Sequence, residues 1–330
     1  MTRVAVGGRL HFGFQNLSLA KSRLYGGVGV AVDRPRLTVE AERAGGVTCD
    51  DEAATPYVER AVAHLGVSGA AVSVERDLPR HVGLGSGTQL ALASLLAVAG
   101  AHDRTVDPRE HAPALDRAGR SGIGVATFEQ GGFVVDGGHP TELFTTAPPE
   151  TGEWTVPPVV ARHDLPDGWR FVLAVPDAPA GESGEAEDES MRSVVERADP
   201  GIAEEIAGLV TQELLPAAAT ADRAAFGRAV ARLGRLNGAW YADEQGGVYR
   251  PPAGELVERL STDAAVAGAG QSSWGPTVYA LTSAGYETSV AETAREALAA
   301  ADCEGEVIVT RPRNEGATVT GSEGTTVTDG

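Results

Sequence analysis

The stretch LPRHVGLGSGTQLALASLLAVAG, Leu78 to Gly100, decides the fold, because a glycine-rich loop runs directly into an apolar segment. Glycines at 83, 85 and 87 allow the backbone to turn tightly and to point its N–H groups outward. Leucines and alanines follow with almost no polar face, which is typical of a helix inside a core. The pattern predicts a loop followed by a buried helix.

The N-terminus of this helix would direct partial positive charge at the loop, where a phosphate would be stabilised. The hydroxyls of Ser86 and Thr88 accompany the glycines. Two common phosphate-binding patterns do not match, because no Lys follows the loop as Walker A requires and Thr88 stands where GxGxxG needs Gly. The alternative is a tight strand-to-helix connection without a ligand. We expect a phosphate site of another type.

Composition limits the classes of protein. The 330 residues are enough for one large or two medium domains, and we expect two. The net charge of −19, with Lys21 the single lysine, disfavours nucleic acid and anionic membranes and is typical of proteins kept soluble in concentrated salt. Cys49 and Cys303 are far apart, which indicates neither a zinc site nor a disulfide framework. Without a long apolar run or leader, we expect a cytoplasmic protein.

Periodicity predicts the remaining elements. Residues 3–14 alternate as a strand that places Arg9 and His11 on one face, although each is a solvated or hydrogen-bonded residue in the alternative interpretation. We expect Pro35 to break the segment after it into two strands. The acidic run 180–190 predicts a solvated loop, with a divalent-cation site as the alternative. The other expected elements are strands at 70–75, 133–136, 171–175 and 306–310, helices at 54–65, 108–118 and 290–301, three or four helices within 191–260, and a strand, loop and helix from 266 onward.

Three loops rich in glycine and hydroxyl residues resemble the motifs of the GHMP kinase superfamily. LPRHVGLGSGTQLALA is similar to the second motif, a Pro followed by GLGSS and a helix, with Gly87 and Thr88 in place of Ser and Ala, and GAGQSSWGPTVYAL lies where the third motif is expected. Across Arg9 to Ala317, six strings in order resemble the β-ribofuranosylaminobenzene 5′-phosphate synthase family: RLHFGF, GLGSGTQ, RSGIGVATFEQGGFVVDGG, QGGVYRPP, AGAGQSSWGPTVYA and RNEGA.

The resemblance implies an α+β, GHMP kinase-like fold of two domains. Residues 1–155 would form an N-terminal half like domain 2 of ribosomal protein S5, which carries the phosphate loop. Residues 156–317 would form a ferredoxin-like C-terminal half, with the boundary in the proline-rich segment 146–168. We expect residues 318–330, which are small and polar, to be a flexible tail.

The resemblance also implies a reaction. Phosphoribosyl diphosphate and 4-aminobenzoate, or 4-hydroxybenzoate in some members, would give an aryl ribofuranoside phosphate, CO2 and diphosphate, with Mg2+. Superfamily kinases often carry a GTPSGID loop, and Gly124 stands at its Asp position here, which argues against phosphoryl transfer. An ATP-dependent small-molecule kinase and a non-catalytic phosphometabolite-binding protein are the alternatives. The sequence leaves the oligomeric state open, a homodimer included.

The departing diphosphate requires N–H groups, Arg and a metal, which assigns roles to the motif residues. We expect the first loop to hold the diphosphate, with Ser86 contacting Mg2+, and apolar side chains to favour loss of CO2. Phe12, Phe128 and Trp274 are candidates for the latter, and core packing is the alternative for each. The catalytic candidates are His81, Ser86 and Thr88, with a local hydrogen-bonding role as the alternative for His81, and His11 and His139 as further candidates for proton transfer. The substrate-binding candidates are Arg9, His11, Gly83, Leu84, Gly85, Gly87, Gln89, Arg120, Ser121, Gly268, Gly270, Gln271, Ser272, Ser273, Arg311 and Arg313, in which the four arginines would clamp the 5-phosphate or the aryl carboxylate.

Overall fold

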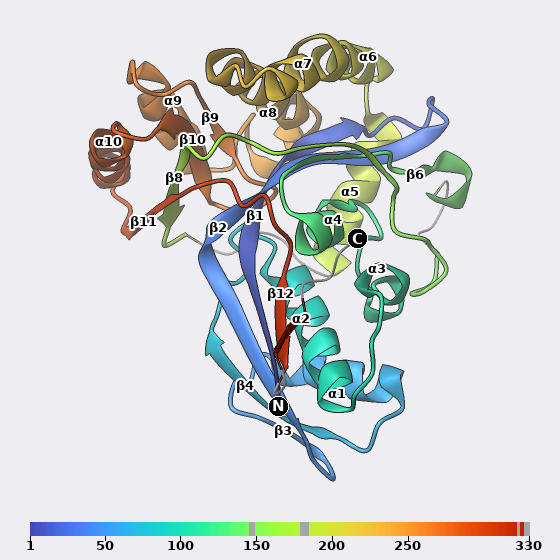
Figure 1. Ribbon diagram of the computed structural model, residues 1–330. Helices are drawn as coiled ribbons and strands as arrows, with labels where there is room; N and C mark the ends of the chain where they lie inside the picture. Colours follow the sequence, from blue (N-terminus) through green and yellow to red (C-terminus); the bar gives the residue numbers. More distant parts are fainter. Residues whose placement is uncertain (145–148, 179–184, 322–323, 327–330) are drawn as a thin grey trace.

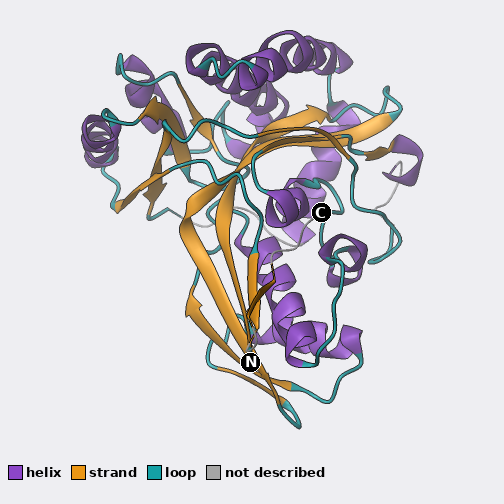
Figure 2. Ribbon diagram, in the orientation of Figure 1, coloured by secondary structure: helices purple, strands orange, loops and turns teal. Residues whose placement is uncertain are grey.

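The computed structural model describes residues 1–144, 149–178, 185–321 and 324–326. Among these residues, nine strands form one sheet and four form another (Figures 1 and 2). The strands of the larger sheet are β1 (Thr2–Asn16), β2 (Arg23–Arg43), β3 (Val47–Cys49), β4 (Ala70–Arg76), β5 (Phe133–Asp136), β6 (His139–Pro140), β7 (Val159–His163), β12 (Thr318–Gly321) and β13 (Gly324–Thr326). The smaller sheet contains β8 (Trp169–Pro176), β9 (Gly268–Gln271), β10 (Val278–Ser283) and β11 (Gly305–Thr310). The α-helices are α1 (Thr55–Leu65), α2 (Ser86–Ala101), α3 (Pro108–His111), α4 (Ile123–Gln130), α5 (Glu185–Arg197), α6 (Pro200–Leu209), α7 (Leu215–Ala219), α8 (Arg223–Gln245), α9 (Ala253–Thr262) and α10 (Glu287–Ala300).

β1 and β2 pair antiparallel along most of their length, and the predicted break at Pro35 is wrong. β2 continues through this residue, because the register between Gly7 and Arg9 of β1 skips residues 32–35 of β2. A proline, which has no N–H to donate, is accommodated at such an irregularity. The bulged segment binds the end of the chain instead, where the N–H of Asp33 donates to the carbonyl of Arg311 over 3.0 Å.

Helices α1 and α2 cover the lower part of the larger sheet (Figure 1). The prediction of a buried helix after the glycine loop is confirmed, because α2 is apolar on all sides and lies between the sheet and other helices. The helix begins where the glycine loop ends, at Ser86. The larger sheet and its helices thereby fix one end of the loop in the core.

The smaller sheet has the ferredoxin-like order β11-β8-β10-β9, and every adjacent pair is antiparallel. Helices α9 and α10 pack on one face, and the apolar side chains of the other face join β1, β2 and α8 in a common core. The helix predicted after 273 is wrong. VYALTS instead forms β10, paired with β9 in a hairpin, which agrees with the strand preference of its Val, Tyr and Thr residues.

Several boundaries differ from the expectations. The helix expected over 108–118 ends at His111, with a 3₁₀ turn from Pro113, because proline disrupts continuation of the helix. Of the acidic run, residues 180–184 lie outside the described residues, and α5 begins at Glu185. The flexible tail is wrong at its start, because Thr318–Gly321 pairs with β1.

The domain division at 155/156 stays a prediction, and sheet pairing gives β7 and β12 to the larger sheet.

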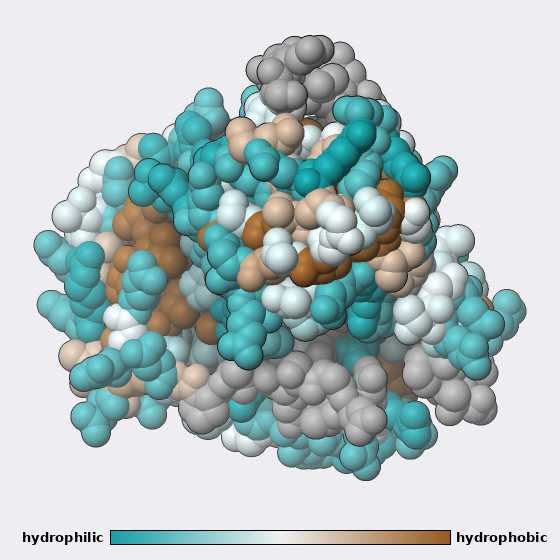
Figure 3. Space-filling view, turned by 90° about the horizontal axis from the view of Figure 1, so that it is seen from below, coloured by the Kyte–Doolittle hydropathy of each residue, from teal (hydrophilic) through white to brown (hydrophobic). Residues whose placement is uncertain are grey.

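Seen from below, the surface is mostly hydrophilic, and apolar side chains gather in a recess on the side of the smaller sheet (Figure 3). Within the described residues, no helix is both long and apolar enough to cross a membrane.

Candidate active site

The glycine loop has the predicted tight backbone at Gly83 and Gly85, whereas Gly87 and Thr88 of the expected loop belong to α2. Gly83 and Gly85 have φ angles of 91° and 80°, in the region that side chains rarely adopt. Leu84 between them is fully buried and anchors the loop in the core. Because α2 begins at Ser86, the first N–H groups of the helix have no acceptor within it and face the loop. The arrangement suits an anion.

Two side chains fasten the loop to the rest of the site. Arg9 donates from Nη1 to the carbonyl of Gly83 over 2.7 Å, and its backbone N–H donates to the carbonyl of Leu84 over 3.0 Å. The fully buried Ser272 donates from Oγ to the same Gly83 carbonyl over 2.7 Å. Its Oγ also accepts from the backbone N–H of His11 at 3.1 Å. Strand β1, the glycine loop and the β9–β10 turn therefore meet at one point.

Close backbone contact between the loop and the β9–β10 turn requires glycine. A Cβ on Gly83 would lie 2.2 Å from the carbonyl oxygen of Ser272, and a Cβ on Gly275 would lie 2.1 Å from the carbonyl of Val82. The second and third glycine-hydroxyl motifs are therefore packed against each other. Their proximity, which sequence alone could only suggest, builds one site from both halves of the chain.

A buried polar chain continues from His11. Its Nε2 lies 3.2 Å from Oγ of Ser121, which donates to Oδ2 of Asp136 over 3.3 Å. Since the hydroxyl proton is directed to the carboxylate, Nε2–H of His11 is the donor to Oγ. Asp136 also accepts the backbone N–H groups of Gly122 and Gly138, at 2.9 and 2.8 Å. The carboxylate thus holds Ser121 and Gly122 of the RSGIG stretch in place.

Burial sets the protonation states in this chain. It is the main cause that lowers the pKa of His11 to about 3, and the charge of Arg9 lowers it further, so the imidazole is neutral near pH 7. Burial raises the pKa of Asp136 to about 6, against the opposing effect of the N–H groups and Ser121. At neutral pH this row of hydrogen-bonded side chains therefore begins with a neutral imidazole, that of His11, and ends with a carboxylate, that of Asp136.

Thr88 and Gly124 are in direct contact across the helices α2 and α4. A Cβ on Gly124 would lie 3.0 Å from Cγ2 of Thr88, which is too close without a shift. Gln89 also reaches α4, donating from Nε2 to the carbonyl of Gly124 over 2.9 Å. The two positions at which the chain differs from the kinase pattern therefore lie against each other.

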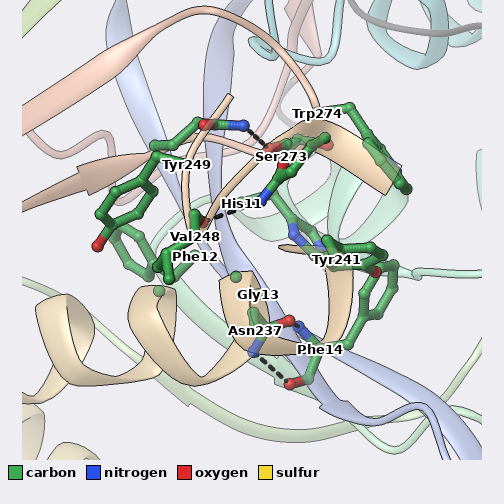
Figure 4. A pocket seen from close by; sticks show the side chains of 14 residues that line it. His11, Phe12, Gly13, Phe14, Asn237, Tyr241, Val248, Tyr249, Ser273 and Trp274 are labelled. Atoms are coloured by element: carbon green, nitrogen blue, oxygen red, sulfur yellow. Dashed lines mark hydrogen bonds between the residues drawn. The ribbon is translucent and has the colours of Figure 1, made fainter. Parts of the chain in front are cut away.

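A cavity of about 50 Å³ lies beside the junction of β1, the glycine loop and the β9–β10 turn, and it is bounded by β1, α8 and that turn (Figure 4). Trp274 and Tyr241 pack ring to ring, with centroids 4.5 Å apart. Asn237 of α8 holds β1, because it accepts from the N–H of Phe14 over 2.6 Å and donates to its carbonyl over 3.0 Å. The cavity is lined by His11, Phe12, Gly13, Phe14, Gly234, Asn237, Gly238, Tyr241, Gln245, Val248, Tyr249, Gln271, Ser273 and Trp274.

The structure does not bring every candidate to this junction. Arg311 and Arg313 lie 3.7 and 3.6 Å from the carboxylate of Asp33, and Arg313 also donates to the carbonyl of Gly316 over 2.7 Å. These contacts stabilise the β2 bulge. A clamping role for either arginine stays a prediction, as it does for the half-buried Arg120 next to Ser121.

The candidates in β9 and its turn have structural contacts of their own. Gly268 allows β9 to approach α8, since a Cβ there would lie 1.9 Å from the carbonyl of Gly227, and Gly270 makes room for the hydroxyl of Tyr279. Gln271 braces the turn by donating to the carbonyl of Ser273 over 3.0 Å. Both glycines therefore have a packing role.

Of the other histidine and aromatic candidates, some lie at the cavity and others lie away from it. His81 is exposed, with a φ of 58°. His139 is buried against the carbonyl of Ala118 at 2.9 Å, and burial lowers its pKa to about 4, which indicates a structural role. Trp274 and Phe12 line the cavity, whereas Phe128 is in the core between α2 and the larger sheet.

Sequence reasoning missed four residues. Asp136 was seen only as the end of the strand FVVD, and Asn237 and Tyr241 only as part of a helical pattern. Arg117 approaches the loop, since its Nη1 would lie 3.4 Å from a Cβ on Gly87. An Asp directly before two glycines was the one available signal; nothing in the sequence marks the others. Among the described residues, no three His, Cys, Asp or Glu side chains are arranged to hold a metal ion.

Comparison with known proteins agrees with this geometry. Residues 36–132 match the family model "GHMP kinases N terminal domain", and residues 214–302 match "GHMP kinases C terminal". The chain is 34% identical to the β-ribofuranosylphenol 5′-phosphate synthase of Archaeoglobus fulgidus, over 96% of this chain and 98% of that protein. It is 32% identical to the enzyme of the same name from Methanothermobacter thermautotrophicus, over 94% and 95% of the two chains.

Solved structures show the same fold. A mevalonate pyrophosphate decarboxylase from Streptococcus pyogenes has a TM-score of 0.66 at 12% identity, covering 95% of this chain and 97% of that one. A homoserine kinase from Cytophaga hutchinsonii has a TM-score of 0.64 at 16% identity, with 97% of each chain covered. The expected GHMP kinase-like α+β fold is confirmed.

Proposed function

Because the chain belongs to the GHMP kinase superfamily and, within it, to the family of β-ribofuranosylphenol 5′-phosphate synthases, we propose that it joins phosphoribosyl diphosphate to a 4-substituted benzoate. The products are an aryl ribofuranoside 5′-phosphate, CO2 and diphosphate, as in methanopterin-type pterin synthesis. The observation that supports this most is the junction at His11 and Ser272, where the glycine loop adjoins an aromatic-lined cavity.

The bond changes define what the site must supply. The ring carbon that bears the carboxylate forms a bond to ribose C1, and the C1–O bond to diphosphate breaks with its electron pair leaving on oxygen. The ring–carboxylate bond then breaks, its electrons return to the ring, and CO2 departs. No proton is transferred in these steps. A neutral His11 is therefore compatible with the reaction.

The loop residues have the properties needed for the leaving group. The outward N–H groups at the start of α2 and the nearby guanidinium of Arg9 would stabilise negative charge as it develops on diphosphate. Gly87 has no side chain that could keep the diphosphate away from these N–H groups. Ser272 and Arg9 both hold the Gly83 carbonyl, so the loop is organised before substrate arrives.

Mg2+ is proposed as an ion carried by the diphosphate. Mg2+ commonly keeps water ligands and binds substrate phosphates with few protein ligands. The hydroxyl of Ser86 is the protein donor that we propose for it. Bound there, the ion would neutralise part of the charge on the leaving group.

Kinase activity is disfavoured by Gly124, which supplies no carboxylate at the position where superfamily kinases often carry Asp. We further propose, from the net charge of −19, that the enzyme works in concentrated salt, and as a separate expectation that it is cytoplasmic. A homodimer stays an alternative to a monomer.

Incubation with defined substrates tests the proposal. In molar salt with Mg2+, phosphoribosyl diphosphate plus 4-hydroxybenzoate or 4-aminobenzoate should release diphosphate, and an Arg9→Gln variant should raise the KM for phosphoribosyl diphosphate about tenfold or more. A matched control is Arg76→Gln, an exposed arginine at the end of β4. ATP consumption with an alcohol acceptor and no diphosphate release would replace the synthase with a kinase. Binding of phosphoribosyl diphosphate without turnover would indicate a binding protein.

A further inference from the structure

The guanidinium of Arg117 lies beside the first turn of α2. Its Nη1 would lie 3.4 Å from a Cβ on Gly87, and the hydroxyl of Tyr57 would lie at the same distance from that Cβ. Among the described residues, this guanidinium makes one hydrogen bond, from Nε to the carbonyl of Leu115 over 3.1 Å. Nη1 therefore keeps its N–H groups for another acceptor, next to the N–H groups at the start of the helix.

The surroundings of Arg117 hold this guanidinium in place. Its Cζ lies 5.9 Å from the centre of the Tyr57 ring, within the range of a cation–π contact. The carboxylate of Asp116 is 3.8 Å from Nη2, which is too far for a hydrogen bond. The side chain of Arg117 is 23% exposed, so a ligand can reach it. Arg117 is thus positioned by its neighbours without being used up by them.

Arg9 lies beside the preceding glycine of the loop. A Cβ on Gly85 would lie 3.3 Å from Cζ of Arg9. The start of α2 therefore has one guanidinium next to residue 85 and a second one next to residue 87. Arg9 comes two residues before His11, which lines the cavity. Arg117 instead contacts Tyr57 of α1, the helix that packs against α2 (Figure 1).

We propose that Arg117 binds the terminal phosphate of the diphosphate group of phosphoribosyl diphosphate. This inference rests on the proposed function and gives the diphosphate a direction along the start of α2. Ribose C1 must meet the aromatic ring at the cavity, so the phosphate bonded to C1 lies on the side of Arg9. The terminal phosphate then extends past Gly87 toward Arg117.

The chemistry of the leaving group agrees with this direction. A guanidinium is always charged and can bind two phosphate oxygens at once. The diphosphate gains negative charge as its bond to C1 breaks, and a second guanidinium at its far end would stabilise that charge. A single phosphate beside Arg9 would leave Arg117 unused. The site should therefore prefer diphosphate to orthophosphate, and Arg117 should be the cause of that preference.

Isothermal titration calorimetry with inorganic diphosphate and with orthophosphate, in one buffer of molar potassium chloride, tests the role of Arg117. The wild type should bind diphosphate at least about tenfold more tightly than orthophosphate. Arg117→Gln should weaken diphosphate about tenfold and orthophosphate by less than about threefold. Arg117→Lys keeps the charge without the planar fork, so it should lose less affinity for diphosphate than Arg117→Gln.

Arg60→Gln is the matched control. Arg60 is an exposed arginine of α1 that also donates to the carbonyl of Leu115, over 3.2 Å, but it is not one of the side chains beside Gly87. This variant removes the same charge and a hydrogen bond to the same carbonyl. It should keep the preference for diphosphate, and its thermal unfolding midpoint should match that of Arg117→Gln.

The outcomes separate this inference from the proposed function. If Arg117→Gln keeps the preference, or Arg60→Gln loses it equally, the assignment of Arg117 is wrong even where the wild type makes product. If the preference depends on Arg117 but phosphoribosyl diphosphate and 4-hydroxybenzoate give no aryl product, the diphosphate site stands and the proposed reaction fails. A wild type that binds neither anion overturns both.

Discussion

Replacing Ser272 with alanine removes one hydroxyl at the point where both halves of the chain meet. Oγ of Ser272 donates to the Gly83 carbonyl over 2.7 Å and accepts from the N–H of His11 over 3.1 Å. In Ser272→Ala the Gly83 carbonyl keeps its bond from Arg9, but the His11 N–H is left buried without an acceptor. An unsatisfied buried donor costs about 1–3 kcal/mol, so we expect about 2 kcal/mol of lost stability.

Function should change with stability, because the same bond positions the glycine loop. Urea unfolding gives the stability, and steady-state kinetics should show the KM for phosphoribosyl diphosphate raised several-fold. Ser261→Ala is the control, since its hydroxyl donates to a carbonyl one turn earlier in α9, away from the site. It should change stability by less than about 0.5 kcal/mol. A Ser272→Ala variant as stable as this control, with an unaltered KM, would refute the reasoning.

Three further predictions use separate features. Gly124→Ala should cost about 1 kcal/mol more in the wild type than in a Thr88→Ala background, and a double-mutant cycle of unfolding energies measures that coupling. Removal of residues 318–330 should lower stability by about 1–2 kcal/mol, because β12 then no longer pairs with β1; an unchanged urea midpoint would contradict this. Burial raises the pKa of Asp136 from 3.8 to about 6, so the folded protein binds this proton more tightly and loses stability as pH rises through that interval. Asp136→Asn lacks that loss. Its free energy of unfolding relative to the wild type should therefore rise by up to about 1.4 kcal/mol per pH unit from pH 4 to 6. A difference between the two proteins that does not change with pH would exclude titration of Asp136.

Local sequence signals predicted the elements that depend on local chemistry. The apolar run after Ser86 has no polar face, which left burial inside a core as the natural interpretation, and α2 is buried. The helix expected from residue 108 begins there, and the side chain of Asp107 caps it by accepting from the N–H of Arg109. The glycines at 83, 85 and 87 predicted a tight turn, which Gly83 and Gly85 form with positive φ angles, whereas Gly87 already lies in α2. In each case, neighbours in the chain determine the backbone.

Long-range pairing decided the features that the sequence could not predict. Pro35 is typical of a break, but pairing of the 32–35 bulge with the end of the chain lets β2 continue. VYALTS after the third loop became a strand because β8 and β9 lie on either side of it. Asp136 gained its role only because Ser121 and two backbone N–H groups are brought to it. Such contacts leave no periodic trace in one sequence.

We propose that the loop and the cavity form one site in which ribose replaces the carboxylate of the aromatic acid. The most direct measurement is the stoichiometry of the reaction with 4-hydroxybenzoate carrying a labelled carboxyl carbon. We predict equal amounts of labelled CO2, diphosphate and an aryl ribofuranoside phosphate that has lost the label. Diphosphate released with the label retained in the aryl product, or no release of either, would contradict the account.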